Sequence, residues 1–182
     1  MPTIMTHAAV PLAAGFALGP TRVRRSVVVV GVMLAMLPDI DTVSFLLGID
    51  YADPFGHRGA SHSLFAAGVI ALTATALLRS SQWRATFAFL FASMASHGLL
   101  DALTSGGLGP ALLWPFEPDR LFAPFRPIRV SPIGGGFFST RGLVVLLSEA
   151  QWVWLPAISA ALMLRWLLPN KAHTAAKEDH NP

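Results

Sequence analysis

The chain contains no cysteine and few charged residues. The absence of Cys from all 182 residues excludes disulfide bonds, thiolate metal ligands and cysteine nucleophiles. Only 13% of the residues are charged, about half the share of an average soluble domain, whereas 53% are hydrophobic. Any bound metal must therefore be held by His, Asp and Glu, and we expect an integral membrane protein.

The chain also lacks a long polar linker between its apolar parts, so one domain is expected over residues 1–170, followed by a polar and disordered tail, 171–182. Five apolar segments cover residues 8–18, 27–47, 63–78, 85–103 and 143–168. Several fall short of the ~20 residues that span ~30 Å of hydrocarbon, so thinned or partly re-entrant ends are expected. The predicted fold is all-α, a multi-pass transmembrane bundle of about five apolar helices.

Basic residues divide between the two ends of these segments. Eight share one side, namely Arg22, Arg24, Arg25, Arg79, Arg84, Arg165, Lys171 and Lys177. The positive-inside rule makes this side cytoplasmic. The opposite side carries a Gly/Pro-rich loop, residues 104–142, and loops of this length usually serve as a lid or a binding element. Because the basic residues are spread over short loops rather than set on one stripe, a nucleic-acid partner is not expected.

Ionisable residues inside the apolar segments lie at nearly constant distances from the basic ends. The separations are 15 residues from His7 to Arg22, 14 from Arg25 to Asp39, 17 from His62 to Arg79, 13 from Arg84 to His97 and 16 from Glu149 to Arg165. At 1.5 Å rise per residue these are roughly 20 to 26 Å of helix. Ionisable groups in a membrane span cost on the order of 2.5 to 3.5 kcal/mol each, so they are normally functional and partnered. We therefore expect a shared polar site toward the extracytoplasmic face.

The strongest local motif is Ser96-His97-Gly98-Leu99-Leu100-Asp101. His97 and Asp101 are four residues apart and share one helix face, where an imidazole nitrogen and a carboxylate oxygen can reach one cation. The alternative is a simple hydrogen bond between His97 and Asp101 that satisfies two buried polar groups.

A second motif is Leu37-Pro38-Asp39-Ile40-Asp41. Two carboxylates two residues apart diverge on a regular helix, but Pro38 removes a backbone donor and favours a break that aims both inward. Alternatively, Pro38 and Asp39 open a second helix as its first residue and cap.

The third motif contains His57, Arg58, Ser61 and His62, just before an apolar segment. Two His five residues apart around a Gly can converge on one centre, and Ser61 is expected to cap the following helix. The alternative for these histidines is ordinary loop polarity. His7 and Glu149 lie near the ends of the first and last segments, where contact with interfacial water is the alternative.

The combined set of predicted metal ligands exceeds the four that one tetrahedral zinc requires. It comprises His7, Asp39, Asp41, His57, His62, His97, Asp101 and Glu149. Two or three metals fit this set better, and a thiolate-free mixture of His and carboxylates suits zinc, manganese or iron in a hydrolytic centre.

The motifs together resemble those of a known membrane family. In order, they read T-H near the start, P-D-I-D, H-R-G-x-S-H-S, S-H-x-L-L-D-x-x-T and L-W-P-F, followed by an Arg and Glu149. From Thr6 to Glu149 this pattern is similar to the YdjM-like family of inner-membrane metal-dependent hydrolases. That family more remotely resembles the zinc-dependent phospholipase C and single-strand-specific nuclease group, whose H-x-x-x-D helix motif His97 and Asp101 match. The resemblance implies a mainly helical protein of the bacterial inner membrane and metal-dependent phosphoester hydrolysis.

The expected function is hydrolysis of a phosphoester of a lipid or lipid-linked substrate by a metal-activated water. One of Asp39, Asp41 and Glu149 is expected to act as general base or to orient the water. Candidates for holding the phosphate are Arg58, Arg120, Arg126 and Arg129. Two alternatives stay open: a metal or proton transporter, although the cytoplasmic half offers only scattered Ser and Thr, and a structural protein whose metal ties the helices together.

Overall fold

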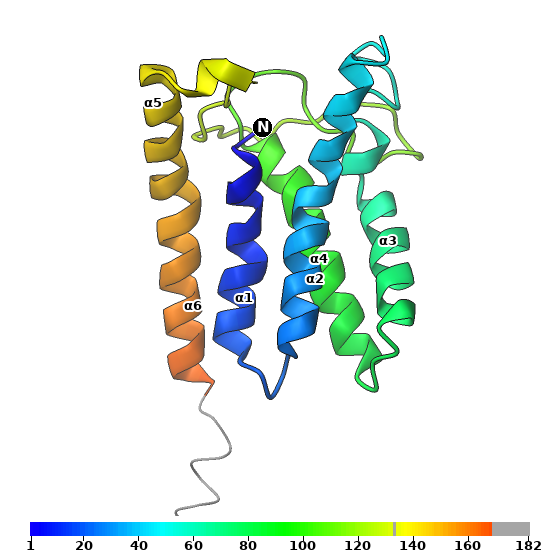
Figure 1. Cartoon of the computed structure of the whole chain (residues 1–182), viewed down its shortest axis with the longest axis vertical. Coiled ribbons are helices and arrows are strands. Elements are labelled where there is room, and N and C mark those ends of the chain that lie inside the picture. The colour runs from blue at the N-terminus through cyan, green and yellow to red at the C-terminus, as the bar shows by residue number, and fades with distance from the viewer. Residues whose placement is uncertain (133, 169–182) are drawn as a thin grey trace, which may run out of the picture.

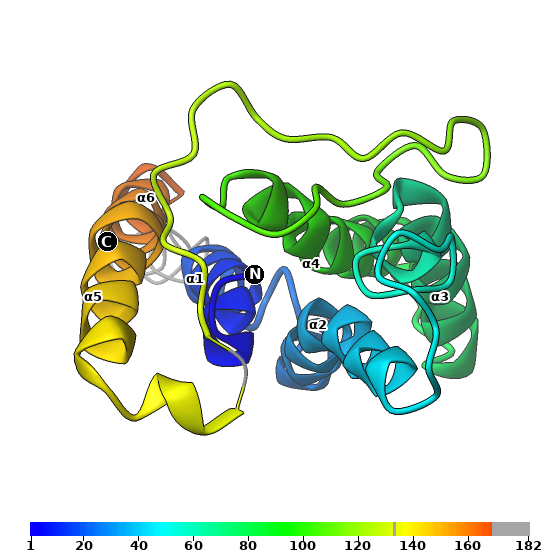
Figure 2. The same cartoon turned by 90° about the horizontal axis from the view of Figure 1, so that it is seen from above.

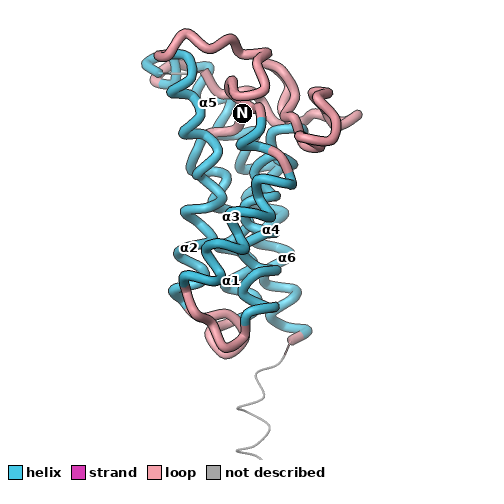
Figure 3. The backbone as a smooth tube through the Cα atoms, turned by 90° about the vertical axis from the view of Figure 1, so that its right-hand side faces the viewer, coloured by secondary structure: helices cyan, strands magenta, loops and turns pink. Residues whose placement is uncertain are grey.

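The computed structural model describes residues 1–132 and 134–168, and within these ranges it contains helices and no strand beyond one isolated bridge, between Thr104 and Ile128 (Figure 3). The α-helices are α1 (Ala9–Leu18), α2 (Arg25–Met36), α3 (Leu64–Leu77), α4 (Trp83–Ala102), α5 (Thr140–Glu149) and α6 (Leu155–Leu167). Short 3₁₀ helices are η1 (Ile4–Ala8), η2 (Leu37–Phe45), η3 (Ala60–His62) and η4 (Gly134–Phe137), and η5 (Ala150–Trp154) is a π-helical turn. The predicted tail, 171–182, lies outside the described residues.

The apolar segments are helical, as predicted, and each continuous run of helical residues, including the 3₁₀ and π turns, begins and ends within four residues of its expected bounds. Within residues 1–132 and 134–168, two continuous helices are long and apolar enough to cross a membrane by themselves, Arg25–Phe45 and Thr140–Leu167. Ile4–Leu18 and Leu64–Leu77 are shorter apolar helices. The all-α prediction is confirmed, whereas helix length alone does not establish five membrane spans.

The long helices run side by side along the longest axis of the molecule (Figure 1). α4 packs against both α2 and α3, and α1 packs against α6. One end of this bundle carries the short α1–α2 and α3–α4 turns, and the other carries η2, η3, η4 and the connection from α4 to η4 (Figure 1). Seen from above, this connection runs along the α3–α4 side and returns between α5 and the N-terminus (Figure 2). We call the end with the α1–α2 and α3–α4 turns the basic end and the end with η2, η3 and η4 the site end; the adjoining halves of the bundle are the basic half and the site half.

The basic half of the bundle is held by apolar packing. Its core cluster consists of Val23, Val27, Leu34, Ala67, Ala71, Phe89, Leu90, Met94 and Ala95. Gly31 lets α2 approach α4 closely, because a Cβ at this position would lie 2.7 Å from a ring carbon of Phe89 and 2.9 Å from Ser93 Oγ. Buried hydroxyls in this half bond within their own helix or to the adjoining turn: Thr75 donates to the carbonyl of Ala71, Ser93 to that of Phe89, and Thr86 to the hydroxyl of Ser80. These polar groups are therefore satisfied by residues close in sequence.

The helix of α2 changes type at Pro38. α2 ends at Met36, and the chain continues along the same rod as the 3₁₀ helix η2, with Pro38 in its first turn. Residues two apart are separated by about 120° around a 3₁₀ helix, rather than about 160° around an α-helix. Asp39 and Asp41 therefore diverge less than they would on an α-helix, and they contact different histidines: His7 and His97 for Asp39, His57 and His62 for Asp41. The helix changes type without breaking, and Pro38 stands in the first turn of the second helix, as the alternative expected.

The start of α3 differs from the prediction. α3 begins at Leu64, and Ser63 caps it by accepting a hydrogen bond from the N–H of Ala66 at 3.0 Å. The prediction that Ser61 caps this helix is wrong, because Ser61 lies within η3 and its hydroxyl contacts Asp41 and His62 instead.

Candidate metal centre

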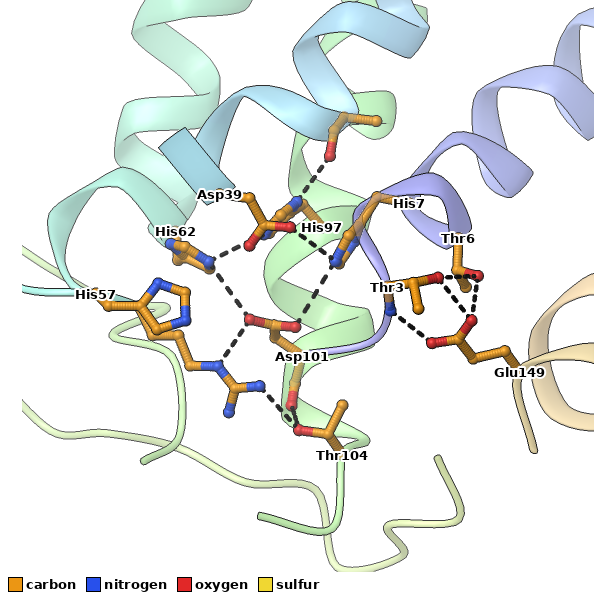
Figure 4. A network of polar contacts seen from close by, with 12 residues as sticks. Thr3, Thr6, His7, Asp39, His57, His62, His97, Asp101, Thr104 and Glu149 are labelled. Carbon is orange, nitrogen blue, oxygen red and sulfur yellow. Dashed lines mark hydrogen bonds and ion pairs between the residues drawn. The ribbon is translucent and has the colours of Figure 1, made fainter. Parts of the chain in front are cut away.

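Five predicted ligands converge at the site end from four different elements. His7 comes from η1, Asp39 from η2, His62 from η3, and His97 and Asp101 from α4. Figure 4 shows their side chains pointing toward one another. All five residues are buried, with exposed fractions of 0 to 3%. The ends of four segments thus enclose one polar centre, although most of their neighbours are apolar.

The donor atoms of these residues lie at spacings typical of ligands around a common centre. His97 Nε2 is 2.9 Å from His62 Nε2 and 3.5 Å from Asp39 Oδ1. Asp101 Oδ2 is 3.4 Å from His62 Nε2. His7 Nε2 is 3.7 Å from Asp39 Oδ2 and 3.8 Å from Asp101 Oδ1. Three overlapping triads have donor atoms within 4.8 Å of one another: His7, Asp39 and His97; Asp39, His57 and His62; and His62, His97 and Asp101.

Several of these buried atoms have no hydrogen-bond partner among the described residues. They are both ring nitrogens of His7 and both carboxylate oxygens of Asp39 and of Asp101, although Asp101 Oδ2 lies within ion-pair distance of Arg58 and His62. Buried polar atoms are normally hydrogen-bonded, and each unsatisfied one costs about 1–3 kcal/mol or more if charged. A cation bound between them would satisfy these atoms together. The donor set therefore fits a divalent metal.

The contacts of Nδ1 in His62 and His97 determine that Nε2 is the ring nitrogen that faces the centre. His97 Nδ1 lies 2.7 Å from the carbonyl oxygen of Ala35, to which it must donate. His62 Nδ1 lies 3.1 Å from Asp41 Oδ2. In a neutral imidazole whose Nδ1 carries the proton, Nε2 keeps its lone pair, and this arrangement is usual for metal-ligating His. His7 and His97 also stack with ring centroids 3.6 Å apart, a contact that favours two neutral rings.

Asp41 lies behind the histidines and makes hydrogen bonds with four groups. Its Oδ1 is 2.6 Å from His57 Nδ1, and its Oδ2 accepts from the backbone N–H of Arg58 at 3.1 Å and from the hydroxyl of Ser61. With His62 Nδ1, both of its oxygens are engaged. Asp41 was predicted as a ligand or base, and the structure places it where it orients imidazoles.

Arg58 is fully buried beside Asp101. Its Nε lies 2.9 Å from Asp101 Oδ2, Nη1 donates to the carbonyls of Gly106 and Leu108, and Nη2 donates to Thr104 Oγ1. Arg58 also adopts a left-handed backbone conformation, φ 63°, which costs a non-glycine residue roughly 1–2 kcal/mol. The guanidinium of Arg58 is therefore engaged by protein groups, whereas the sequence suggested that it binds phosphate.

Charge at the site end is unbalanced. Four buried or nearly buried carboxylates, those of Asp39, Asp41, Asp101 and Glu149, face a single buried guanidinium, that of Arg58. Burial lowers the pKa of His62, but its hydrogen bonds to Asp101 and Asp41 outweigh that effect and raise the pKa to about 9. These carboxylates therefore attract a cation, and a bound metal would displace such a proton.

Glu149 occupies a neighbouring network rather than the centre. Its Oε1 accepts from the backbone N–H of Thr3, and its Oε2 accepts from the hydroxyls of Thr3 and Thr6 at 2.7 and 2.8 Å (Figure 4). Thr6 Oγ1 also accepts from Trp154 Nε1 at 3.0 Å. This network ties α5 and η5 to η1 and so holds the segment that carries His7.

The other three predicted phosphate-binding arginines lie outside the centre. Arg120 donates to the carbonyls of His57, Tyr51 and Asp53. Arg126 is exposed and stacks over Phe122, with its Cζ 4.7 Å from the ring centroid. Arg129 is exposed as well. Arg120 thus fixes the loop behind His57, whereas Arg126, stacked on Phe122, and Arg129 lie at the surface.

Sequence reasoning missed several polar residues that complete the site. They are Thr3, Thr6, Thr104, Trp154 and, in its observed contacts, Ser61. Thr6 and Thr104 stand within the motifs quoted above, next to His7 and three residues after Asp101. Their position within the motifs could have identified them as site residues. It was a weak indication, because single hydroxyls in apolar helices usually bond to their own backbone.

Comparisons with known proteins place this geometry in context. The profile of a family described as "YdjM inner membrane protein" matches residues 1–173. Inner membrane protein YbcI of Escherichia coli (strain K12) is 44% identical over 172 residues, which cover 91% of this chain and 98% of that protein. No solved structure matches the chain significantly.

Proposed function

Because this chain belongs to the YdjM inner membrane protein family, we propose that it is a membrane-embedded, metal-dependent hydrolase. Its substrate is a phosphoester of a lipid or lipid-linked molecule. The observation that carries the proposal is the buried centre itself, in which carboxylates outnumber guanidinium groups and imidazole Nε2 atoms face Asp39 and Asp101. Membership of this family indicates a location in the inner membrane. The buried centre is the basis for the proposed chemistry.

The residues that would hold the metal are His7, Asp39, His62, His97 and Asp101, with His57 as a further ligand. Since Asp39, His62 and His97 each belong to two of the three triads, the set is suited to two or three zinc ions, with manganese or iron as substitutes. A metal bound there supplies Lewis acidity, which acidifies water and offsets negative charge at phosphorus.

The carboxylates divide into different roles in this proposal. Asp39 is the one whose oxygens are both free of hydrogen bonds and which also lines an open cavity, so it is placed to accept a proton or bind a metal. Asp41 and Glu149 accept several hydrogen bonds each, and we assign them to orienting His57 and His62 and to holding the His7 segment. Arg126 and Arg129 are the candidates for contact with phosphate.

A transporter would need a polar path to the basic end. Among the described residues, the buried cluster between the centre and that end is apolar, and the buried hydroxyls of Thr75 and Ser93 bond to their own helices. A structural metal site is favoured by the burial of His7, His97 and Asp101, all 0% exposed. Access to Asp39 from a cavity argues for catalysis over that alternative.

We propose that the whole bundle lies in the membrane as a multi-pass protein. Large apolar side chains are exposed along the short helices as well as the long ones, including Phe16 in α1, Val69 in α3 and Leu162 in α6. A soluble protein rarely exposes apolar surface so widely. In this arrangement the basic end is cytoplasmic and the centre lies toward the extracytoplasmic face.

The test of the activity combines metal analysis with hydrolysis. Detergent-purified protein should contain more than one equivalent of a divalent metal and release product from a phospholipid in mixed micelles. His97→Ala should lose both metal and activity. The control is Asp119→Asn, which changes an exposed carboxylate outside the centre and should alter neither. Metal-free wild-type protein with a stable fold would end the proposal.

Sidedness has its own test, because the chain has no native Cys. Ser81→Cys lies in the α3–α4 turn at the basic end, and Ser105→Cys lies just after Thr104 at the site end; both positions are exposed. We expect a membrane-impermeant maleimide to label only Ser105→Cys in intact spheroplasts. Labelling of both from the same side would contradict the proposed topology.

A further inference from the structure

A cavity of about 320 Å³ opens beside the metal centre. Its walls include Thr3, Ile4 and Met5 from the N-terminal segment, Asp39 and Thr42 from η2, and Phe137 from η4. Most of this lining is apolar. Cavities of this size bind small molecules or parts of larger ones.

Asp39 connects this cavity to the centre. Its side chain is 1% exposed, and neither of its oxygens makes a hydrogen bond within the described residues, yet it forms part of the cavity wall. The same carboxylate lies 3.5 Å from His97 Nε2 and 3.7 Å from His7 Nε2. One end of the cavity is therefore polar and adjoins the predicted ligands, while the rest is apolar.

Large apolar side chains are exposed on the segments that line the cavity and directly beside them. Ile4 is 42% exposed, Met5 59%, Ile40 62% and Phe138 89%. These residues lie on η1, on η2 and next to η4, and the connection from α4, most of which runs along the α3–α4 side (Figure 2), reaches the cavity with Ser131 and Pro132. In a membrane protein, an apolar rim of this kind suits contact with lipid rather than water.

We propose that this cavity is the lateral entrance for a phospholipid, whose phosphate reaches Asp39 while the glycerol and first acyl carbons lie along Ile4, Met5 and Phe137. The inference rests on the proposed function and adds the route and the part of the substrate that is recognised. The phosphate can bind at the carboxylate end of the cavity only through a metal ion, because the negative charge of Asp39 alone would repel it. The apolar walls bind the portion that a water-soluble phosphoester lacks.

A second apolar groove offers a matched comparison. It measures about 270 Å³ and lies between α1 and α6, lined by Leu12, Phe16, Trp154 and Ile158 among others. None of its lining residues belongs to the three ligand triads. Met5 and Leu12 are seven residues apart on the same N-terminal helical rod, and both are exposed, at 59% and 46%. Replacing either with Trp fills one cavity and spares the other.

The experiment uses full-length protein in phosphatidylglycerol vesicles doped with a phosphatidylglycerol that carries a photoreactive diazirine near the start of one acyl chain. Irradiation should give adducts on peptides that contain Met5, Thr42 or Phe137. Met5→Trp should reduce these adducts at least about tenfold, whereas Leu12→Trp should leave them unchanged. Both variants should keep the wild-type metal content, which shows that the centre is intact.

Adducts along α1 and α6 that Leu12→Trp removes would overturn the proposal in favour of the other groove, and adducts unaffected by both variants would overturn it as well. Hydrolysis separates this inference from the proposed function. Met5→Trp should slow cleavage of phosphatidylglycerol but not of soluble bis(p-nitrophenyl) phosphate. If the adducts form as expected and wild-type protein cleaves neither compound, the entrance stands and the hydrolase proposal fails.

Discussion

The two halves of this bundle are held together by different interactions. In the basic half, regular α-helices pack through apolar side chains, and the buried hydroxyls of Thr75, Thr86 and Ser93 bond to groups at most six residues away. In the site half, helices change to 3₁₀ or π geometry, and side chains from distant segments bond to one another, as Glu149 does to Thr3. The first half is determined by local sequence and packing, and the second by long-range polar contacts.

This difference also separates stability from function. Burial of apolar surface in the basic half does not depend on any ligand. The site half confines four carboxylates with the guanidinium of Arg58, and the raised pKa of His62 lets a proton partly offset their charge. If the proposed metal binds there, the bundle has a stable scaffold at one end and a centre whose stability is linked to metal at the other.

The largest expected effect is that of Asp101→Asn. The substitution removes a predicted ligand and leaves the Arg58 guanidinium buried without its ion-pair partner, which lies 2.9 Å away. Breaking a buried pair in this way costs about 3–5 kcal/mol. We expect loss of metal, loss of any hydrolysis and a lower thermal midpoint in detergent. Wild-type metal content in Asp101→Asn would contradict the assignment of Asp101 as a ligand.

Leu90→Ala tests the other half. Leu90 is fully buried in the apolar cluster, and truncation of such a residue costs about 2–5 kcal/mol. The thermal midpoint should fall, while the metal content per folded protein stays at the wild-type value. A loss of metal comparable to that of Asp101→Asn would show that the two halves are not independent.

Asp41→Asn should have a smaller effect, confined to the site. Because Asp41 contacts His57 and His62 through their outer nitrogens, its loss should weaken metal affinity about 10- to 100-fold without removing a direct ligand. Titration of metal-depleted protein with zinc measures this change. An effect as complete as that of Asp101→Asn would make Asp41 a ligand, as the sequence first suggested.

Trp154→Phe is expected to have the smallest effect. It removes the indole hydrogen bond to Thr6 Oγ1 but keeps most of the ring, so the cost is about 0.5–1.5 kcal/mol. Urea or thermal unfolding in detergent should detect this loss, with the metal content unchanged. Thr6 Oγ1 still donates to Glu149 in this variant. A larger loss of stability would mean that the bond from Trp154 to Thr6 also holds His7 in position.

The sequence predicted the helices and the convergence of charged residues for related reasons. Apolar runs fix where helices form, and helical rise fixes how far His7 or His97 lies from a basic end. The partner of each polar atom could not be predicted, because it depends on contacts between distant segments. Glu149 reaches Thr3, 146 residues away, and Arg58 adopts a left-handed backbone beside Asp101. These arrangements leave no periodic pattern in the sequence.

The π-helical turn η5 sets how the two parts of the last helix face the rest of the bundle. α5, η5 and α6 form one uninterrupted helix, Thr140–Leu167, and a π turn accommodates one more residue than an α turn. Deleting one residue from Ala150–Trp154 would restore regular α winding and leave the flanking turns nearly in phase, because the π turn already absorbs that residue. Winding the same residues as an α-helix without a deletion would instead rotate Glu149 by about 100° relative to α6 and turn its carboxylate away from Thr3 and Thr6. The π turn therefore sets the phase between two helix faces, one that meets η1 and one that packs on α1.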